Sequence, residues 1–423
     1  MTKLLQQVRV IDPVSATDRV ADVLIADGYI KAVENRISDV PDGTQMQDGR
    51  GLVLGPGLVD LYSHSGTPGF EERETLLSLC QAAAAGGFTR LAILPDTSPA
   101  IDNPAVVTQL QRLREDALTS GMSPLPQLYF WGALSVEVKG EQMTEFAELA
   151  ASGVIGFADG QPLGNLGLIR RVLEYLQPLD KPLAFWCCDR KLTANGVMRE
   201  GVDAIRFGLP GNPVISETSA IAALLELVAA IGTPVHIMRV STARGVELIT
   251  SAKSQGLPVT ASTTWMHLLL DTKAVGSYDP SLRLEPPLGN KGDVAALRQA
   301  VRQGVLDAIA IDHSPYTYEE KTVSFAEAPP GAIGLELALP LLWQNLVDTG
   351  ELSALELWRA LSSNPAKCLQ MMSAAIAPGN AAELTLFDPQ QTWKVEKQSL
   401  STLATNTPWW GQQLTGRVVE TWF

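Results

Sequence analysis

The stretch ETLLSLCQAAAAGG (74–87), followed closely by LAIL (91–94), sets the pattern of this 423-residue chain. Its first part is rich in leucine and alanine, which favour a helix, and its second part is a short apolar run that favours a buried strand. Further short apolar runs alternate with Ala- and Leu-rich segments at 154–157, 182–185, 234–240 and 308–311. This repetition predicts parallel strands joined by crossover helices.

The repeating pattern extends from about Gly55 to Leu369. Such a length favours a closed (β/α)8 barrel over an open sheet, within an α/β fold class. In barrels of this type the functional side chains lie at the C-terminal ends of the strands. The polar residues that directly follow each apolar run are therefore the candidates for a site.

The two ends of the chain have a different pattern, with short alternating strands and tight turns. DVLIADGYIKAV (22–33) places Asp27-Gly28 between two alternating runs, which predicts a hairpin. Runs near 383–388 and 416–420 have the same character. We expect the two ends to share one small sheet domain.

Composition excludes several classes of protein. With 46% hydrophobic and 18% charged residues the chain is globular rather than disordered. A net charge of −14 disfavours nucleic acids and anionic membranes as partners. The most apolar stretch, 220–231, contains Glu226 and is too short to span a bilayer, and the first residues lack the apolar run of a signal peptide. The four cysteines form no CxxC pair, so we expect a cytoplasmic protein.

Polar clusters follow the predicted strands in order. They lie at 60–64, 95–97, 158–160, 186–189, 239–242 and 312–316. Any single junction between a strand and a loop is polar, so each cluster taken alone means little. The occurrence of all six clusters in order after successive predicted strands is the informative observation.

The motifs around these clusters resemble type I dihydroorotase of the amidohydrolase superfamily. They are GPGLVDLYSHSGTPGFEERET (55–75), AAAAGGFTRLAILPDTSPAIDNPAVV (82–107), IAIDHSPYTYEEK (309–321), FAEAPPGAIGLELALPLL (325–342), NPA (364–366) and NTPWWGQQLTGRVV (406–419). The resemblance implies a (β/α)8 barrel at 55–370, with a small β-sandwich formed by 1–54 and 371–423. It also implies reversible hydrolysis of the cyclic amide of dihydroorotate with one or two zinc ions.

The zinc ligands implied by the resemblance are mostly replaced in this chain. Three histidine positions hold Tyr62, Trp186 and Arg239 instead. A phenol is a weak zinc ligand near neutral pH, an indole nitrogen cannot coordinate, and a guanidinium is permanently cationic. Restoring a two-metal site from the remaining histidines would mean abandoning the matched motifs.

Three implied ligand positions survive, and they are His64, Asp159 and Asp312, the last being the family's catalytic aspartate. They suffice for at most one weakly held zinc ion. We expect Arg239 to project into the same space and to pair with Asp312 or Asp159, replacing the charge of the metal. The metal site is then vestigial, and no cofactor is expected.

Substrate contacts implied by the resemblance are altered in parallel. Positions that clamp an anionic substrate hold Gly66, Asp96 and Glu285, and a contacting histidine is Tyr316. The two acidic side chains would repel an anion. Pro330-Gly331, a backbone contact in the family, is retained.

The remaining histidines and the tryptophan pair favour structural roles. His236 and His267 match no ligand position, so we expect them to be hydrogen-bonded within the core. Asp312 and His313 are neighbours on a strand and point to opposite faces, which argues against a catalytic dyad. Trp409-Trp410 is either an exposed interaction patch or part of the core.

Two functions from different classes remain open at this stage. One is a non-catalytic dihydroorotase homologue of pyrimidine biosynthesis that acts as a structural partner of aspartate carbamoyltransferase in a homo- or hetero-oligomer. The other is an active dihydroorotase or related cyclic amidohydrolase with a divergent, at most mononuclear metal site, in which Asp312 is the general base. A third role, ligand sensing in the old pocket, is supported only by the retained barrel.

Overall fold

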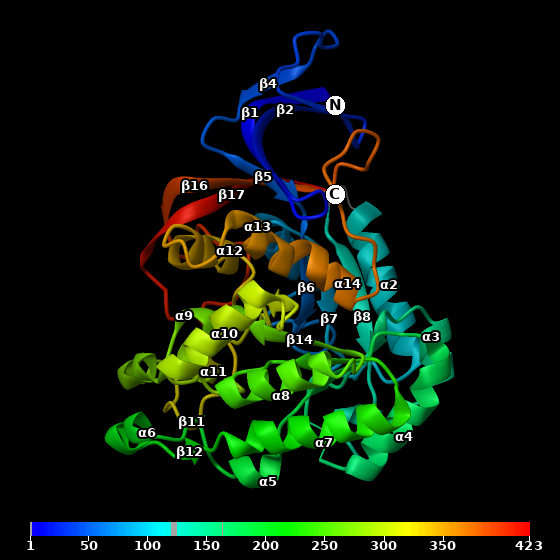
Figure 1. Cartoon of the computed structure of the whole chain (residues 1–423), viewed down its shortest axis with the longest axis vertical. Coiled ribbons are helices and arrows are strands. Elements are labelled where there is room, and N and C mark those ends of the chain that lie inside the picture. Colours follow the sequence, from blue (N-terminus) through cyan, green and yellow to red (C-terminus); the bar gives the residue numbers. More distant parts are fainter. Residues whose placement is uncertain (1, 120–124, 163) are drawn as a thin grey trace.

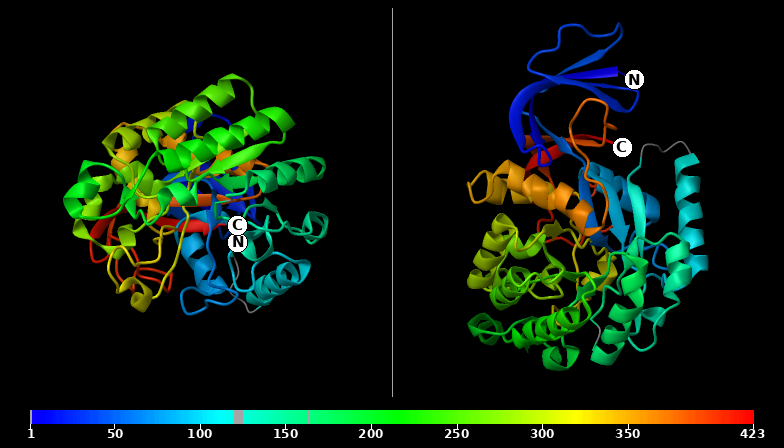
Figure 2. Two further views of the ribbon diagram at one scale, coloured as in Figure 1. Left: turned by 90° about the horizontal axis from the view of Figure 1, so that it is seen from below. Right: turned by 45° about the vertical axis from the view of Figure 1, so that its right-hand side comes forward.

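The computed structural model describes residues 2–119, 125–162 and 164–423. Figure 1 shows a small sheet domain at one end of the molecule and a larger domain of strands and helices below it. Both termini lie close together in the small domain in the views of Figures 1 and 2.

Eight parallel strands form the barrel of the larger domain. In chain order they are β6 (Leu58–Ser63), β7 (Phe88–Ile93), β8 (Gln127–Gly132), β9 (Gly156–Phe157), β10 (Ala184–Trp186), β13 (Val235–Met238), β14 (Val259–Thr264) and β15 (Ala308–Ala310). A bridge between Phe157 and Leu183 joins the two four-stranded halves. The ring closes where the amide of Asp312 donates to the Tyr62 carbonyl at 3.1 Å. The predicted (β/α)8 barrel is confirmed.

Helices surround this barrel on its outer side. They include α1 (Leu76–Ala85), α2 (Pro104–Thr119), α3 (Phe146–Ala151), α4 (Leu166–Leu176), α7 (Ile215–Ile231), α8 (Ala243–Ser254), α10 (Lys291–Gln303), α12 (Ala338–Leu342), α13 (Ala354–Trp358) and α14 (Asn364–Cys368). Helix α1 shows why the opening stretch is helical: Thr75 and Ser78 form a capping box at its start, and Gly86 closes its end. No helix in the described ranges is long and apolar enough to cross a membrane.

The strands of the two chain ends combine in one seven-stranded sheet. It contains β1 (Thr2–Asp12), β2 (Thr17–Ala26), β3 (Tyr29–Glu34), β4 (Gln45–Asp48), β5 (Val53–Pro56), β16 (Leu384–Lys394) and β17 (Gln413–Trp422). Antiparallel pairing of β5 with β16 joins the two ends. The predicted hairpin is present: Asp27 and Gly28 connect β2 to β3 with φ values of 53° and 76°, as a primed turn requires. The small β domain built from both termini is thus confirmed.

Short elements inserted after the barrel strands lie at the C-terminal end of the barrel, opposite the small sheet (Figure 1). They include α5 (Arg190–Thr193), β11 (Met198–Arg199), α6 (Val202–Phe207) and β12 (Gly211–Asn212) after β10, α9 (Trp265–Leu269) and the turn Thr272–Ser277 after β14, and α11 (Tyr318–Lys321) after β15. These insertions cover the barrel mouth, where the polar clusters of the sequence converge.

Candidate functional site

Arg239 occupies the centre of the barrel mouth. Its side chain is only 4% exposed, and its guanidinium binds Asp312 through two hydrogen bonds of 2.8 and 2.6 Å. The Nη1 atom donates to the carbonyl oxygen of Gly160 at 2.8 Å, and Nη2 lies 3.1 Å from Nε2 of His64. The sequence predicted either Asp312 or Asp159 as the partner of Arg239, and in the structure the partner is Asp312. Three of the five N–H donors of the guanidinium are thereby engaged by oxygen acceptors.

Asp312 is held as a carboxylate by this pairing. Burial alone would raise its pKa, but the charge of Arg239 and the hydrogen bonds from His64 and Arg239 lower the pKa to about 2. Both Arg239 and Asp312 have a left-handed backbone with φ of 55°. Such a conformation costs of order 1–2 kcal/mol for a residue with a Cβ, so the fold sustains strain to aim both side chains at the barrel axis.

His64 lies between two carboxylates. Its Nδ1 contacts Asp96 at 2.6 Å, and its Nε2 lies 3.5 Å from Asp312. Burial would lower the pKa of His64, but the charge of Asp96 and the bond to Asp312 raise it to about 9. The imidazolium balances the charge, because two carboxylates then face two cations. In that form Nε2–H points to Asp312, and the approach of Arg239 is a contact rather than a hydrogen bond.

Tyr62 and Trp186 contact Arg239 as uncharged aromatic side chains and do not form ion pairs with it. The phenol of Tyr62 is fully buried, lies 2.9 Å from the Ser262 hydroxyl and accepts the backbone amide of Arg239 at 3.1 Å. Burial raises the pKa of Tyr62, so the phenol keeps its proton. The Arg239 guanidinium lies 4.8 Å from the ring centroid of Trp186, within cation–π range.

Asp159 is directed away from this cluster. One of its oxygens accepts the amides of Leu134 and Ser135 at 2.7 and 3.0 Å, and the other accepts the Ser135 hydroxyl at 2.5 Å. Burial raises the pKa of Asp159 to about 6, although these three donors oppose the rise. Its role in the structure is to hold the loop after β8, while its neighbour Gly160 receives Arg239.

The donors at the barrel mouth do not fit zinc. Both oxygens of Asp312 accept hydrogen bonds from Arg239, and the oxygens of Asp159 face the loop after β8. A zinc ion bound by His64 would stand beside a permanently cationic guanidinium, which lies 3.1 Å from Nε2. Among the described residues no group of three or more His, Cys, Asp or Glu side chains is arranged to hold a metal. His64, Asp159 and Asp312, the three retained ligand positions, therefore do not converge on one point in the structure.

The loop after β6 has closed around Gly66, the first of the altered substrate positions. A Cβ at this position would collide with the backbone oxygens of Phe70 and Glu74. The Gly66 carbonyl also accepts the Phe70 amide at 2.6 Å. Any side chain at position 66 would therefore require a different path for this loop.

Glu285 and Arg190 form a second ion pair that lies across the mouth. The Arg190 guanidinium donates to Glu285 at 2.6 Å and lies 4.9 Å from the ring of Trp186. Arg283 binds the other oxygen of Glu285 at 2.9 Å, and the charges of these two arginines lower the pKa of Glu285 against the effect of burial. Arg190 was missed in the sequence, although it directly follows the cluster at 186–189.

The remaining pocket is small. About 90 Å³ is left in a space lined by residues that include His64, Asp96, Arg239, Glu285, Tyr316 and Pro330-Gly331. Burial raises the pKa of Tyr316 to about 12, and the cations of Arg73 and Lys321 lie 4.9 and 5.0 Å from its ring. Every substrate position predicted from the sequence except Gly66 lines this space, and Gly66 lies in the adjoining loop. Each polar side chain among them already has a charged neighbour.

The other histidines and the tryptophan pair have structural surroundings. His236 is hydrogen-bonded to Thr260 and Ser262, and His267 contacts Thr264 and the Pro286 carbonyl, which confirms the expected structural roles. His313 accepts the Gly334 amide and faces Glu74, not Asp312, so no dyad forms. Trp409 packs against Trp265 with a centroid distance of 5.1 Å, whereas Trp410 is 42% exposed. The pair is therefore divided between core and surface.

Comparisons with known proteins agree with this barrel and its motifs. The family described as "Dihydro-orotase-like" matches residues 51–244. A "Probable dihydroorotase-like protein" of Synechocystis is 46% identical over 99% of both chains. A "Dihydroorotase" of Syntrophus aciditrophicus is 38% identical over 100% of this chain and 97% of its own. The solved L-hydantoinase of Arthrobacter aurescens has a TM-score of 0.85 at 22% identity, covering 99% of this chain and 94% of its own, which is a likeness of fold.

Proposed function

The chain belongs to the dihydroorotase-like family, and from that premise we propose that it is a non-catalytic member. The observation that carries the proposal is the Arg239–Asp312 pair, with Arg239 at the centre of the mouth. Opening a cyclic amide needs an activated water, an electrophile for the carbonyl oxygen and a group that accepts a proton. Asp312 is a poor base, because its pKa is about 2 and both of its oxygens are engaged.

A structural role for the mouth residues supports the same proposal. The Arg239 guanidinium reaches residues that follow β6, β9 and β15 from its own position after β13. Its hydrogen bonds therefore tie three strands of the ring together at their C-terminal ends, and His64 joins β6 to them through Asp312. In this arrangement the former catalytic charges serve as internal cross-links.

We further propose that the chain acts in pyrimidine biosynthesis as a structural partner of aspartate carbamoyltransferase. The support is the family, together with a complete barrel whose mouth charges are paired internally. A chain that keeps the barrel without the catalytic activity would act by binding another protein through its surface.

The test of inactivity is an assay of dihydroorotate and carbamoyl aspartate interconversion in both directions, with and without added Zn²⁺. An active dihydroorotase measured alongside is the positive control. We expect no turnover above the uncatalysed rate and little zinc in protein purified without added metal. Turnover comparable with that of the control, or near-stoichiometric zinc, would overturn the proposal.

The partner proposal has a separate test. Sedimentation of the chain mixed with the aspartate carbamoyltransferase of the same organism should give a joint species at micromolar concentration. Independent sedimentation of the two proteins would contradict the partnership and leave the proposed inactivity standing.

A further inference from the structure

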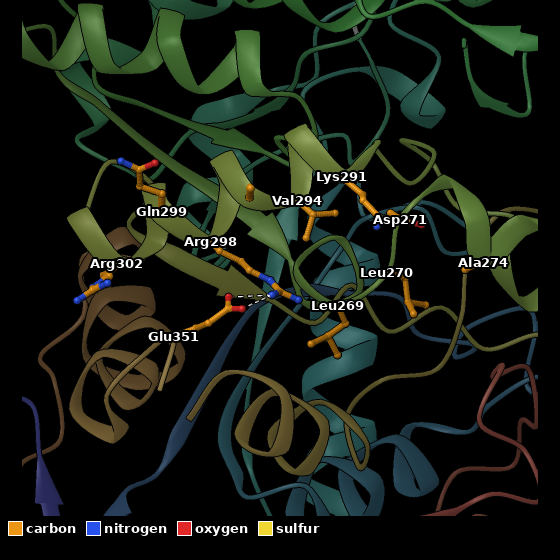
Figure 3. Close-up of a pocket in the computed structure, with 11 residues that line it drawn as sticks. Leu269, Leu270, Asp271, Ala274, Lys291, Val294, Arg298, Gln299, Arg302 and Glu351 are labelled. Atoms are coloured by element: carbon orange, nitrogen blue, oxygen red, sulfur yellow. Dashed lines mark hydrogen bonds and ion pairs between the residues drawn. The ribbon is translucent and has the colours of Figure 1, made fainter. Parts of the chain in front are cut away.

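An open groove of about 700 Å³ runs along the outer side of the barrel, away from the mouth. One wall is a face of α10, from Lys291 to Arg302, and the other is the segment 269–274. Figure 3 shows side chains of both walls, with Arg298 of α10 directed toward Glu351. None of these residues takes part in the Arg239 network.

The centre of the groove is apolar. Leu269, Leu270 and Val294 are half-buried, and Ala295 is exposed beside them. On the outside of a barrel helix such positions are normally polar, because they face water. An apolar strip between two walls is typical of surfaces that receive a peptide.

Charges of both signs line the groove: Lys291, Arg298 and Arg302 are basic, and Asp271 and Glu351 are acidic. Arg298 is neutralised, because it binds both oxygens of Glu351 at 2.8 Å. Within the described ranges Lys291 forms no ion pair, and the contact of Arg302 with Glu356 is long, at 3.9 Å. Two cations are thus available, one at each end of the strip, on a chain whose net charge is −14.

We infer that this groove binds an acidic segment of another protein, with apolar side chains on the strip and carboxylates at Lys291 and Arg302. The two cations are eleven helical steps apart, so they stand about 16 Å from each other, which is the span of about five extended residues. A second copy of this chain is a poorer occupant, because two chains of net charge −14 repel each other. The inference goes beyond the proposed function and holds for any partner of this chemistry.

Fluorescence anisotropy with a labelled nine-residue peptide tests the inference. The peptide carries two glutamates at each end and leucines in the middle, and a matched peptide has lysines in place of the glutamates. We expect saturable binding of the acidic peptide only, weakening as NaCl is raised. The variant Lys291→Glu/Arg302→Glu should weaken binding at least about tenfold.

Two further variants test whether the peptide binds to the groove itself or responds only to the overall charge of the protein. Lys31→Glu/Arg112→Glu changes two exposed cations elsewhere by the same charge and should bind the peptide within about twofold of the wild type. Ala295→Trp blocks the strip without changing charge and should weaken binding at least about tenfold. Circular dichroism and urea unfolding confirm that each variant is folded.

Several outcomes would overturn the inference. One is failure of the wild type to bind the acidic peptide at about 100 μM protein, and another is equal affinity in the wild type and the Lys291→Glu/Arg302→Glu variant. Displacement of the peptide by free citrate as effectively as by unlabelled peptide would identify a small-anion site instead. Dimerisation of the wild type that Ala295→Trp abolishes would identify a second copy as the occupant.

Discussion

Arg239–Asp312 at the barrel mouth and Arg90–Glu383 at the junction with the small sheet are the same interaction in two places. Each arginine binds its carboxylate through Nε and an Nη atom, at 2.8 and 2.6 Å in both pairs. Both pairs are largely buried, with side chains 4% and 15% exposed at the mouth and 13% and 12% exposed at the junction. Geometry alone does not distinguish them.

The two pairs differ in the role that their residues would have if they were not paired. Arg90 on β7 joins the barrel to the residue before β16, and Thr89 adds a hydrogen bond of 2.6 Å to the same carboxylate. Neither Arg90 nor Glu383 is among the site residues predicted from the sequence. At the mouth the same bidentate bond engages Asp312, for which the resemblance to dihydroorotase implies a role in proton transfer. Under the proposed function, the pair at the mouth therefore also withdraws a proton acceptor, whereas the pair at the junction only stabilises the fold.

The largest effect is expected from breaking the mouth pair. Arg239→Met leaves the buried Asp312 with only its longer contact to His64 and should lower the free energy of unfolding by about 3–5 kcal/mol. Urea unfolding followed by circular dichroism measures the change. The double variant Arg239→Met/Asp312→Leu removes both charges and should be more stable than Arg239→Met. A single variant as stable as the wild type would show that the pair does not hold the mouth together.

A second difference between the regions is their dependence on pH. The folded pKa of His64, about 9, lies above its ordinary value of 6.5. Its stabilisation is therefore complete below pH 6.5 and is lost as the pH rises through 9, a change of about 3 kcal/mol.

Urea unfolding between pH 6 and pH 10 should show this loss in the wild type and in Arg90→Met, but not in His64→Gln. The junction pair contains no histidine. A wild-type stability that stays level up to pH 10, or an unchanged slope in His64→Gln, would contradict the imidazolium state.

Breaking the junction pair should have a smaller effect. Arg90→Met removes two charge-assisted hydrogen bonds to Glu383, but Thr89 still donates to that carboxylate. We expect a loss of about 2 kcal/mol by urea unfolding. The Thr89→Val variant, which keeps the ion pair, is the matched comparison. A loss as large as that of Arg239→Met would mean that the two sites are energetically equivalent.

Local patterns allowed much of the fold to be predicted from the sequence. Alternating helical and apolar segments gave the barrel, and Asp27-Gly28 gave the hairpin, because each signal lies within a few neighbouring residues. Strand β8 was not singled out, and this omission has a consequence for the site. The loop after β8 contains Ser135, which holds Asp159 away from the mouth.

The candidate site was less accessible to sequence reasoning. Motif positions identified Arg239 and Asp312, but the choice between Asp312 and Asp159 depends on which way each side chain points. Such directions are set by contacts between loops that are distant in sequence. Cations at positions 291, 298 and 302 lie on one face of α10 and were a usable signal for the groove, because helical periodicity places them together.

The smallest effect should come from the more exposed pair across the mouth, Arg190–Glu285. The Arg190 side chain is 45% exposed, and Glu285 keeps Arg283 as a partner if Arg190 is removed. Arg190→Ala should therefore cost less than about 1 kcal/mol in urea unfolding, and the cost should vanish in 1 M NaCl, where exposed charges are screened. Arg239→Met should keep its cost in the same salt, because its pair is shielded from ions. If both costs fall equally in salt, burial does not separate the two pairs, and the mouth network is held by ordinary surface electrostatics.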